Sequence, residues 1–274
     1  MKFYLSMDME GVTALPDYTY VDSAEANYER GRRLMTEDAN AIIRGSVDAG
    51  AEEFLVNDSH SNMNNLIAEE LHEEAELITG GVKTFSMVEG LDSSFTGAFF
   101  AGYHARAGQK GVMAHSMIFA VRTIWIDDVE VGELGFNAYV AGYHGVPVLM
   151  VAGDDYACRE AEALIPNITT AAVKQSLSRS AVRTLHPKKA QRLLREQTMR
   201  AIENRKNVKP LVPPEEPLLK IEFTNYGEAE LAAMMPGCEL EEGTTIVRFQ
   251  AKDILEAYQA MLVMTELAMQ AKFC

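Results

Sequence analysis

The sequence predicts an α/β protein with a mostly parallel sheet flanked by helices, followed by a smaller α+β C-terminal portion. Short apolar runs alternate with helical patterns over residues 1–180, which is typical of parallel strands joined by helices. The connection between the first two runs is long enough for a crossover helix. Hydrophobic residues make up 47% of the 274 residues and charged residues 24%, so the chain can bury a large core.

The first elements form a strand–helix–strand unit. The run KFYLSMD predicts a strand, residues 25–49 have helical spacing and end at Gly50, and EEFLVND predicts the second strand. A unit of this length places two parallel strands side by side. Further strands are predicted at GAFFAGYH, TIWID, VPVLMVAGDD and ITTAAVKQ, with a short helix over residues 156–164 that Pro166 ends.

The C-terminal part of the chain has a different pattern. A charged amphipathic helix over residues 185–206 precedes the segment KPLVPPEEP, whose prolines indicate a linker or a rigid turn. The elements after it are predicted as a strand at LLKIEFTN, a helix over residues 228–235, a strand at TTIVRF and a helix over residues 253–272. Asp253 is the expected N-cap of that last helix.

This change of pattern near residue 180 predicts two portions. Residues 1–180 are expected to form the α/β metal-binding catalytic domain. Residues 181–274 are expected to form a smaller α+β portion that packs on the first and contributes to oligomer contacts. The last helix has an apolar stripe, which favours a core face or a subunit contact over a cofactor site. The stripe consists of Ile254, Tyr258, Met261, Leu262 and Thr265.

The charge of the chain excludes several classes of partner. With 25 basic and 40 acidic residues, its formal net charge is −15. Such a surface repels phosphate backbones and anionic lipids, so we expect no nucleic acid and no membrane as partner. It attracts metal ions and cationic substrates, although acidic surfaces also simply aid solubility.

The sequence shows no sign of export or of a membrane span. No apolar run reaches 18 residues, and the N-terminus is a strand pattern and not a signal peptide. The widely spaced Cys158, Cys238 and Cys274 fit a reducing cytoplasm.

Two carboxylates follow the first predicted strand. Asp8 and Glu10 are two positions apart, so in extended chain both side chains point to the same side. Gly11 then allows a sharp turn. Carboxylate oxygens bind zinc, manganese or magnesium, and one carboxylate can bridge two ions. An isolated pair of this kind is also common as two solvated acids at a strand end.

Histidines follow the next apolar runs. His60 lies in a polar loop after the second strand, where Asp58 or a backbone carbonyl could orient its ring. His104 ends another apolar run, and His115 lies among small and apolar neighbours, where burial lowers the pKa of an imidazole. Each of these could also be a core histidine or, for His60, part of a turn. Glu133 precedes a helix of small residues, where the helix dipole alone would favour a carboxylate.

These six side chains together predict a metal site. The carboxyl ends of parallel strands meet at one crevice, which is where ligands bind in open α/β sheets. Competing motifs are absent: the sequence has no phosphate-binding loop, no dinucleotide fingerprint and no serine nucleophile elbow. The segment HEEAE at His72 fails as a zinc helix because its fifth residue is Glu76. Asp154 and Asp155 remain reserve candidates for contacts around the site.

At these residues the chain resembles the binuclear-zinc D-aminopeptidases of the bacterial dipeptide operon, also called dipeptide transport proteins. The resemblance covers essentially the whole length and rests on long blocks in family order. These are SMDMEGVTALPD, NYERGRRLMTEDAN, VNDSHSNMNNL, KTFSMVEGLD, GYHARAG, GVMAHSMIF, VGELGFNAYVAGY, PVLMVAGDD and TAAVKQSLSRSA. By this resemblance the zinc ligands correspond to Asp8, Glu10, His60, His104 and Glu133, with Asp8 as the bridge between two Zn²⁺ per subunit. His115 corresponds to the residue that the family assigns as catalytic nucleophile.

The resemblance also implies an activity and an assembly. It implies hydrolysis of the N-terminal, preferably D-, residue from short peptides such as D-Ala-D-Ala, in a cytoplasmic homodecamer with an internal chamber. A pair of ions can share and activate a water, which leaves His115 as the acid/base or as a donor to the oxyanion. A covalent role of His115 would require an acyl-imidazole instead. The alternatives are a dipeptide-binding protein with non-catalytic zinc, and a binuclear hydrolase of another amide or of a phosphoester.

Overall fold

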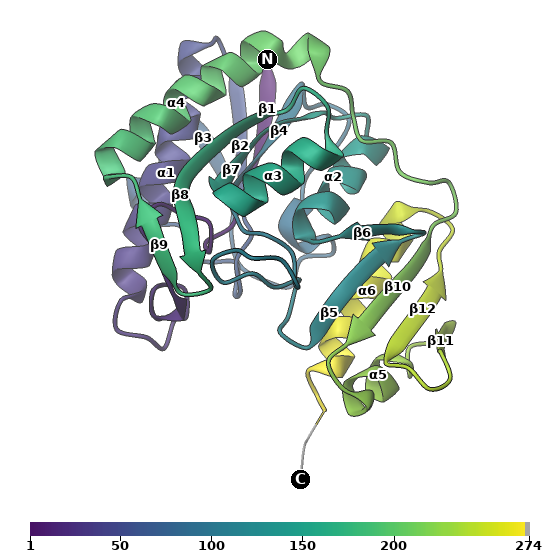
Figure 1. Ribbon diagram of the computed structural model, residues 1–274. Helices are drawn as coiled ribbons and strands as arrows, with labels where there is room; N and C mark the ends of the chain where they lie inside the picture. The colour runs from purple at the N-terminus through teal and green to yellow at the C-terminus, as the bar shows by residue number, and fades with distance from the viewer. Residues whose placement is uncertain (272–274) are drawn as a thin grey trace.

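The larger of two β-sheets is mostly parallel and has helices on both faces (Figure 1). The computed structural model describes residues 1–271. Along the sheet the strands are β3 (Ala75–Ile78), β2 (Glu53–Asp58), β1 (Lys2–Met7), β4 (Gly97–Tyr103), β7 (Val148–Asp154), β8 (Thr169–Ser178) and β9 (Ala181–Thr184). All neighbouring pairs are parallel except β8 with β9. The predicted fold class is confirmed.

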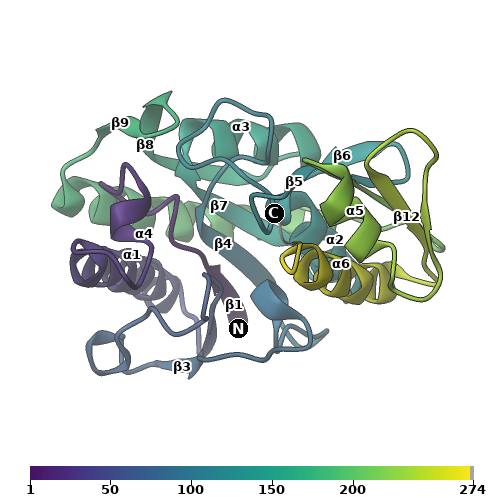
Figure 2. The same ribbon diagram turned by 90° about the horizontal axis from the view of Figure 1, so that it is seen from below.

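Helices cover both faces of this sheet, and others pack on the smaller sheet. They are α1 (Tyr28–Asp48), α2 (Glu133–Tyr143), α3 (Asp155–Leu164), α4 (Pro187–Asn204), α5 (Tyr226–Ala232) and α6 (Ile254–Ala268), of which α5 and α6 contact the smaller sheet. Helices α1 and α4 pack against each other on one face, and α2 and α3 lie on the other (Figure 2). Strands β4 and β7 are buried along their whole length because both faces are covered, which explains their continuous apolar sequences.

The smaller sheet is antiparallel. Its order is β11 (Cys238–Leu240), β12 (Ile246–Gln250), β10 (Leu218–Phe223), β5 (Val121–Ile126) and β6 (Val129–Val131). Here one element of the sequence-based prediction is wrong, since the run TIWID was expected to belong to the parallel sheet. It forms β5, which pairs with β10 and, through a tight turn with Asp127 at φ 54°, with β6. An apolar run does not reveal its partner strand, and this two-residue turn was the missed hairpin signal.

The two sheets divide the chain differently from the predicted boundary at residue 180. Strands β5 and β6 precede that boundary but belong to the smaller sheet, whereas β9 and α4 follow it but pack with the larger one. One continuous hydrophobic core includes residues of both sheets. The division into a catalytic domain over residues 1–180 and a smaller portion over residues 181–274 stays a prediction.

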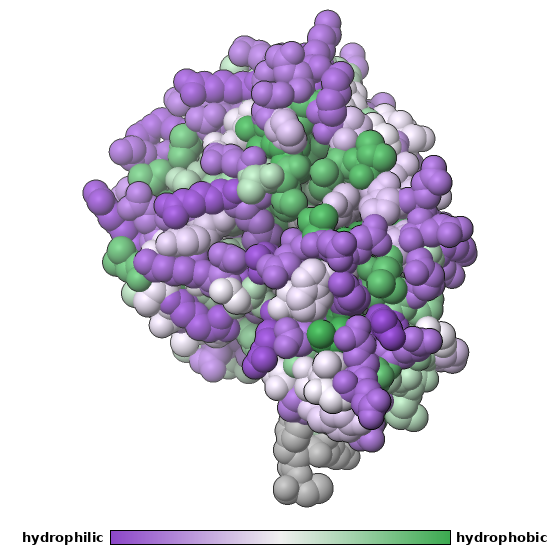
Figure 3. Space-filling model, turned by 45° about the vertical axis from the view of Figure 1, so that its right-hand side comes forward, coloured by the Kyte–Doolittle hydropathy of each residue, from purple (hydrophilic) through white to green (hydrophobic). Residues whose placement is uncertain are grey.

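The end of the chain was predicted in part. Asp253 caps α6 as expected, since its carboxylate accepts the backbone N–H of Glu256 at 2.8 Å. The helix itself ends at Ala268, and the predicted end at Lys272, like Cys274, lies outside the described residues. Among residues 1–271 no helix combines the length and the apolarity needed to cross a bilayer. Figure 3 shows a largely hydrophilic face with apolar side chains gathered in smaller patches.

The backbones beyond β1 and β4 approach each other closely. The N–H of Gly11 donates to the carbonyl of Gly102 at 2.6 Å. A Cβ on Gly11 would lie 2.0 Å from the carbonyl oxygen of Tyr103, and one on Gly102 would lie 1.9 Å from that of Asp8. Gly102 also has a φ of +72°, a backbone angle that residues with a side chain rarely adopt. Two glycines therefore bring the residues that follow β1 and β4 to the same place.

We expect Gly102→Ala to lower the free energy of unfolding by more than about 4 kcal/mol, because the methyl group meets backbone on a strained φ. Gly108→Ala is the matched control. It has a φ of +80° but nothing within 4 Å of the added Cβ, so only the conformational cost of about 1–2 kcal/mol applies. Urea denaturation followed by the fluorescence of Trp125 measures both. Equal losses in the two variants would show that the close approach is unimportant.

Candidate metal centre

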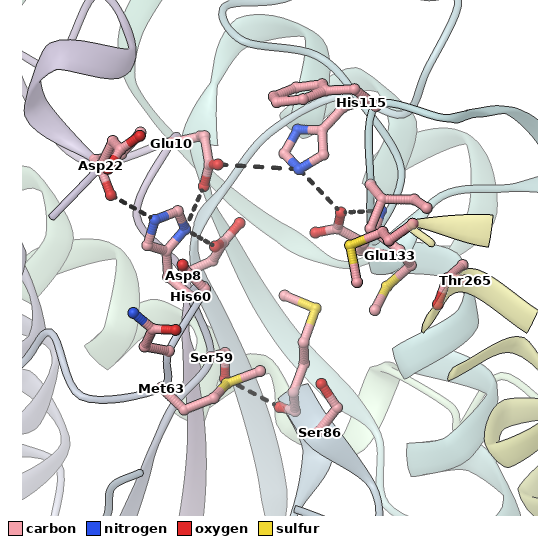
Figure 4. A pocket seen from close by; sticks show the side chains of 18 of the residues that line it. Asp8, Glu10, Asp22, Ser59, His60, Met63, Ser86, His115, Glu133 and Thr265 are labelled. Carbon is pink, nitrogen blue, oxygen red and sulfur yellow. Dashed lines mark hydrogen bonds and ion pairs between the residues drawn. The ribbon is translucent and has the colours of Figure 1, made fainter. Parts of the chain in front are cut away.

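The six residues singled out in the sequence lie together at the carboxyl end of the larger sheet. Figure 4 labels five of them, Asp8, Glu10, His60, His115 and Glu133. Asp8 follows β1 directly, His60 comes two residues after β2, and His104 follows β4 directly. Because β1 lies between β2 and β4, these three chain segments are neighbours. Glu133 approaches from another side as the first residue of α2.

Asp8 lies between two histidines. Its Oδ1 is 3.5 Å from His60 Nδ1, and its Oδ2 is 3.6 Å from His104 Nε2. The second carboxylate near His60 is Glu10, whose Oε2 lies 3.0 Å from Nδ1. The second carboxylate near His104 is Glu133, whose Oε2 lies 3.2 Å from Nε2. Each Asp8 oxygen thus belongs to a different carboxylate–imidazole set.

These contacts define two groups that could each hold a cation. Asp8, Glu10 and His60 form one, and Asp8, His104 and Glu133 form the other; within each group the ligand atoms lie within 4.8 Å of one another. Carboxylate oxygens and imidazole nitrogens are the donor set of catalytic zinc sites. Asp8 is common to both groups.

Unpartnered atoms support the fit to a metal. Asp8, Glu10 and His104 are 2%, 3% and 4% exposed. Asp8 Oδ2, Glu10 Oε2 and His104 Nε2 are buried, and within residues 1–271 none of them has a partner in hydrogen-bond geometry, although Glu10 Oε2 and His104 Nε2 have ion-pair neighbours at 3.0 and 3.2 Å. Buried polar atoms are nearly always paired because leaving them unpaired costs free energy. Atoms of this kind from three side chains converge here, and divalent cations would satisfy them.

The protonation of the cluster reflects burial and crowded charge. Burial, followed by the neighbouring Glu10, raises the pKa of Asp8 to about 8. Burial also opposes the ionisation of Glu10, but His60 and then His115 hold the pKa of Glu10 well below its usual range. For His104 burial is outweighed by Glu133, so its pKa is raised well above its ordinary value. Without cations the cluster therefore shares protons, and metal binding would release them.

His115 comes from an irregular loop after β4. Its Nε2 lies 3.7 Å from Glu133 Oε1 and 4.0 Å from Glu10 Oε1, and its ring stacks on that of His104 with centroids 4.2 Å apart. Burial and the neighbouring His104 lower its pKa, in the direction that the sequence predicted. The expectation of few charged neighbours was wrong, because both carboxylates come from distant parts of the chain. His115 also forms a third possible ligand group with Glu10 and His104.

Backbone carbonyls orient two of the histidines. The Nε2 atom of His60 lies 2.9 Å from the carbonyl of Val21, and Nδ1 of His104 lies 2.9 Å from that of Ala105. Such contacts fix the ring and leave the other nitrogen free to bind a metal. Of the two partners proposed for His60 in the sequence, the carbonyl is the one observed. The Asp58 carboxylate instead accepts the backbone N–H groups of Asn65 and Leu66.

The two reserve candidates have structural contacts. Asp154 caps α3 by accepting the N–H groups of Tyr156 and Ala157, and it also accepts the N–H of Val112 in the loop that carries His115. Asp155 accepts the N–H of Ser176. Asp154 thus holds the loop of the site without facing the cluster.

Lys174 supports the site and was missed in the sequence. It is 1% exposed, and its ammonium donates to the carbonyls of Glu10, Val12 and Leu15 at 2.5, 2.8 and 2.7 Å. Burial lowers its pKa to about 7. The lysine thereby ties the turn that carries Glu10 to β8. The sequence signal that could have identified this lysine is that it is the single charged residue within the predicted strand ITTAAVKQ.

A pocket of about 610 Å³ opens onto the cluster. Asp8, Glu10, His60, His115 and Glu133 line one part of it. Leu262, Thr265, Glu266 and Met269 of the C-terminal segment also line it. The apolar stripe of α6 was expected to be a core face or a subunit contact. Its residues Tyr258 and Met261 are buried, but Leu262 and Thr265 also line this pocket.

Comparison with known proteins gives concordant matches. The sequence model of the D-aminopeptidase family matches residues 1–263. A D-aminopeptidase from Bacillus subtilis strain 168 is 66% identical over 274 residues, which is 100% of both chains. A solved structure from Bacillus subtilis, described as a zinc-dependent D-aminopeptidase and a self-compartmentalizing protease, superposes with a TM-score of 0.99 at 65% identity over 100% of both chains.

Proposed function

This chain belongs to the D-aminopeptidase family, and from that premise we propose that it is a zinc-dependent aminopeptidase. Its proposed reaction releases the N-terminal D-residue from short peptides such as D-Ala-D-Ala. The observation that carries the proposal is the pair of ligand groups that share Asp8 beside a pocket. A structural zinc site commonly fills four positions with Cys and His, whereas a carboxylate-rich group leaves room for water and substrate.

The proposed cofactor is two Zn²⁺ per subunit. Asp8, Glu10 and His60 would hold one ion, and Asp8, His104 and Glu133 would hold the other. The unpartnered oxygens and nitrogen of the cluster support this assignment. Zinc, when bound, supplies a Lewis acid that lowers the pKa of water and polarises a carbonyl.

His115 is the proposed acid and base. Its Nδ1 lies 2.9 Å from the carbonyl of Met113, which only accepts, so Nδ1 carries the proton and Nε2 is free on the side of the cluster. Burial keeps the imidazole neutral near pH 7 by lowering its pKa. In this role Nε2 takes a proton from the attacking water and passes it to the departing amino group. The acyl-imidazole alternative would use the same nitrogen as a nucleophile.

The character of the pocket supports a substrate with a free amine. Besides the cluster itself, the acidic residues Asp22 and Glu266 line it. Lysine and arginine are absent from its lining, as far as residues 1–271 are concerned. Carboxylates at these positions favour a protonated N-terminus over an anionic group. This selects for peptide N-termini and fits an aminopeptidase.

Self-association in the cytoplasm is part of the proposal. The structural relative is described as self-compartmentalizing, and we propose a homodecamer for this chain. Large apolar side chains remain exposed on the single chain, including Val82, Leu177, Val212 and Met234. Where such side chains gather into a contiguous patch, that patch is a candidate subunit contact. Light scattering coupled to size-exclusion chromatography measures the subunit number.

We expect the purified protein to release alanine from D-Ala-D-Ala, and a chelator to abolish the release until zinc is added back. A panel of D- and L-aminoacyl peptides, with amides and phosphoesters beside them, measures the substrate class. Preference for D-aminoacyl peptides supports the proposal. Binding of D-Ala-D-Ala without turnover would favour a binding protein with non-catalytic zinc. Turnover restricted to other amides or to phosphoesters would favour another binuclear hydrolase.

A further inference from the structure

We propose that Tyr18 and Arg179 form a clamp that holds the backbone around Met113 and thereby positions the side chain of His115. The inference rests on the proposed role of His115. It adds two positioning residues that lie outside the ligand groups and come from distant parts of the chain. Tyr18 begins a short 3₁₀ helix (Tyr18–Tyr20) after β1, and Arg179 lies in the turn between β8 and β9.

The orientation of His115 depends on one carbonyl. Its Nδ1 donates to the carbonyl of Met113, two residues earlier, at 2.9 Å. This bond turns Nε2 toward Glu10 and Glu133. If the peptide unit of Met113 rotated, the His115 ring would lose the hydrogen bond that keeps the proton on Nδ1 and that points Nε2 at the two carboxylates. The position of that peptide unit is therefore a requirement for proton transfer at Nε2.

The backbone around His115 is strained. Met113 has a φ of 51° and Met117 a φ of 62°, values that residues with side chains adopt at a cost of about 1–3 kcal/mol each. The loop between β4 and β5 has no helix or regular strand to impose these angles. Such a conformation persists only where surrounding contacts hold it.

Arg179 supplies three of these contacts. Its backbone carbonyl accepts the N–H of Met113 at 2.8 Å. Its guanidinium donates through Nη1 to the carbonyl of Ala114 at 2.5 Å and through Nη2 to the Tyr18 hydroxyl at 3.1 Å. Arg179 thus binds the N–H of Met113 through its own backbone carbonyl, while its guanidinium binds the Ala114 carbonyl and the Tyr18 hydroxyl at once. A planar fork with several donors suits these two guanidinium contacts, and a lysine can reproduce them only in part.

Tyr18 completes the clamp. Its hydroxyl accepts from Arg179 and donates to the same Met113 carbonyl that His115 uses, at 3.2 Å. Its ring packs edge-on against Phe119 with centroids 5.1 Å apart, and Phe119 lies 5.1 Å from the ring of His115. The Arg179 guanidinium lies 5.8 Å from the rings of both Tyr18 and Phe119. These contacts limit the movement of His115 in two ways: they hold the backbone carbonyl that its ring binds, and they hold the phenyl ring that packs beside its imidazole.

A neighbouring arginine–tyrosine pair provides a matched control. Arg30 donates to the Tyr20 hydroxyl at 3.3 Å and lies 5.7 Å from its ring, which is the same kind of pair. Neither residue has a hydrogen bond to the His115 loop within the described part of the chain. Tyr20→Phe and Arg30→Gln therefore remove equivalent local contacts and leave the clamp intact.

The test compares Tyr18→Phe and Arg179→Gln with these two controls in the zinc-loaded protein. We expect each clamp variant to lower kcat by about 10–100-fold, the size of effect that a small misplacement of a reacting group produces. KM, zinc content and thermal midpoint should stay near those of the unchanged protein. The double variant should lose little more than either single one, because the two side chains bind each other and hold adjacent peptide units of the same loop. Arg179→Lys should recover part of the loss, and the control variants should retain kcat.

Other outcomes overturn the inference. Unchanged kcat in both clamp variants would show that His115 does not depend on them. A raised KM with unchanged kcat would make Tyr18 a substrate contact instead, and loss of zinc or a lowered thermal midpoint would make the clamp structural. His115→Ala, measured in parallel, separates this inference from the proposed function. If that variant is fully active, the proposed role of His115 fails and the clamp fails with it; if it is inactive while the clamp variants are normal, only the clamp fails. Absence of turnover of D-aminoacyl peptides by the unchanged protein is the separate result that would overturn the proposed function.

Discussion

His115→Ala is expected to lower kcat by about 10²–10⁴-fold while both zinc ions remain bound. The size is that of a lost acid–base group. The reason for retained metal is geometric: Asp8, Glu10, His60, His104 and Glu133 supply two complete groups without this ring. Steady-state kinetics and zinc analysis of the same preparation measure the two quantities.

The control for this variant is His144→Ala. His144 is half-buried at the C-terminal end of α2, and its ring packs edge-on against Tyr143 instead of facing the cluster. Its removal should leave kcat unchanged. Loss of zinc in His115→Ala would instead identify His115 as a ligand, through its group with Glu10 and His104. An acyl-enzyme trapped by acid quenching and seen by mass spectrometry would favour the covalent role.

Asp8→Ala is expected to abolish measurable turnover and to lower zinc content from two ions to one or none per subunit. Both ligand groups include Asp8, so its removal leaves each with two members. In the proposed arrangement, two ions would also lose the carboxylate that they share. Zinc analysis after dialysis against a metal buffer measures the loss, and a normal content of two ions would contradict the bridging role.

A second measurement on Asp8→Ala distinguishes loss of a ligand from loss of fold. Without zinc, Asp8 is a buried carboxyl group with an unpartnered oxygen, so its removal should not lower the thermal midpoint of the zinc-free protein. Asp38→Asn is the matched control. Asp38 is equally buried and accepts the N–H of Thr13 at 2.9 Å, but it belongs to no ligand group. That variant should lose stability and keep its zinc.

The convergence of the site could be predicted because it follows from strand order. Apolar runs predicted β1, β2 and β4, and parallel strands place their following residues at one edge of the sheet. Asp8, His60 and His104 are therefore neighbours for a reason that the sequence contains. Their roles as ligands stay predictions. What the structure adds is that each oxygen of Asp8 faces a different histidine.

The contacts that support the site could not be predicted because they join distant segments through the backbone. Lys174 binds three carbonyls that are about 160 positions away in the chain, and a carbonyl carries no sequence signal. The same holds for Arg179 and the carbonyl of Ala114. The partner of β5 was missed for a related reason, since pairing with β10 bridges about 100 residues.

The placement of α6 has a consequence for how this enzyme family can diversify. The candidate cation ligands all come from the first half of the chain, whereas Leu262 and Thr265, which line the same pocket, belong to α6. Substitutions on that helix can reshape the space available to a peptide without changing any ligand. The candidate metal ligands and this part of the pocket lining are thereby encoded in separate stretches of the gene. Evolution can change the substrate preference of the enzyme through α6 while the reaction itself is conserved.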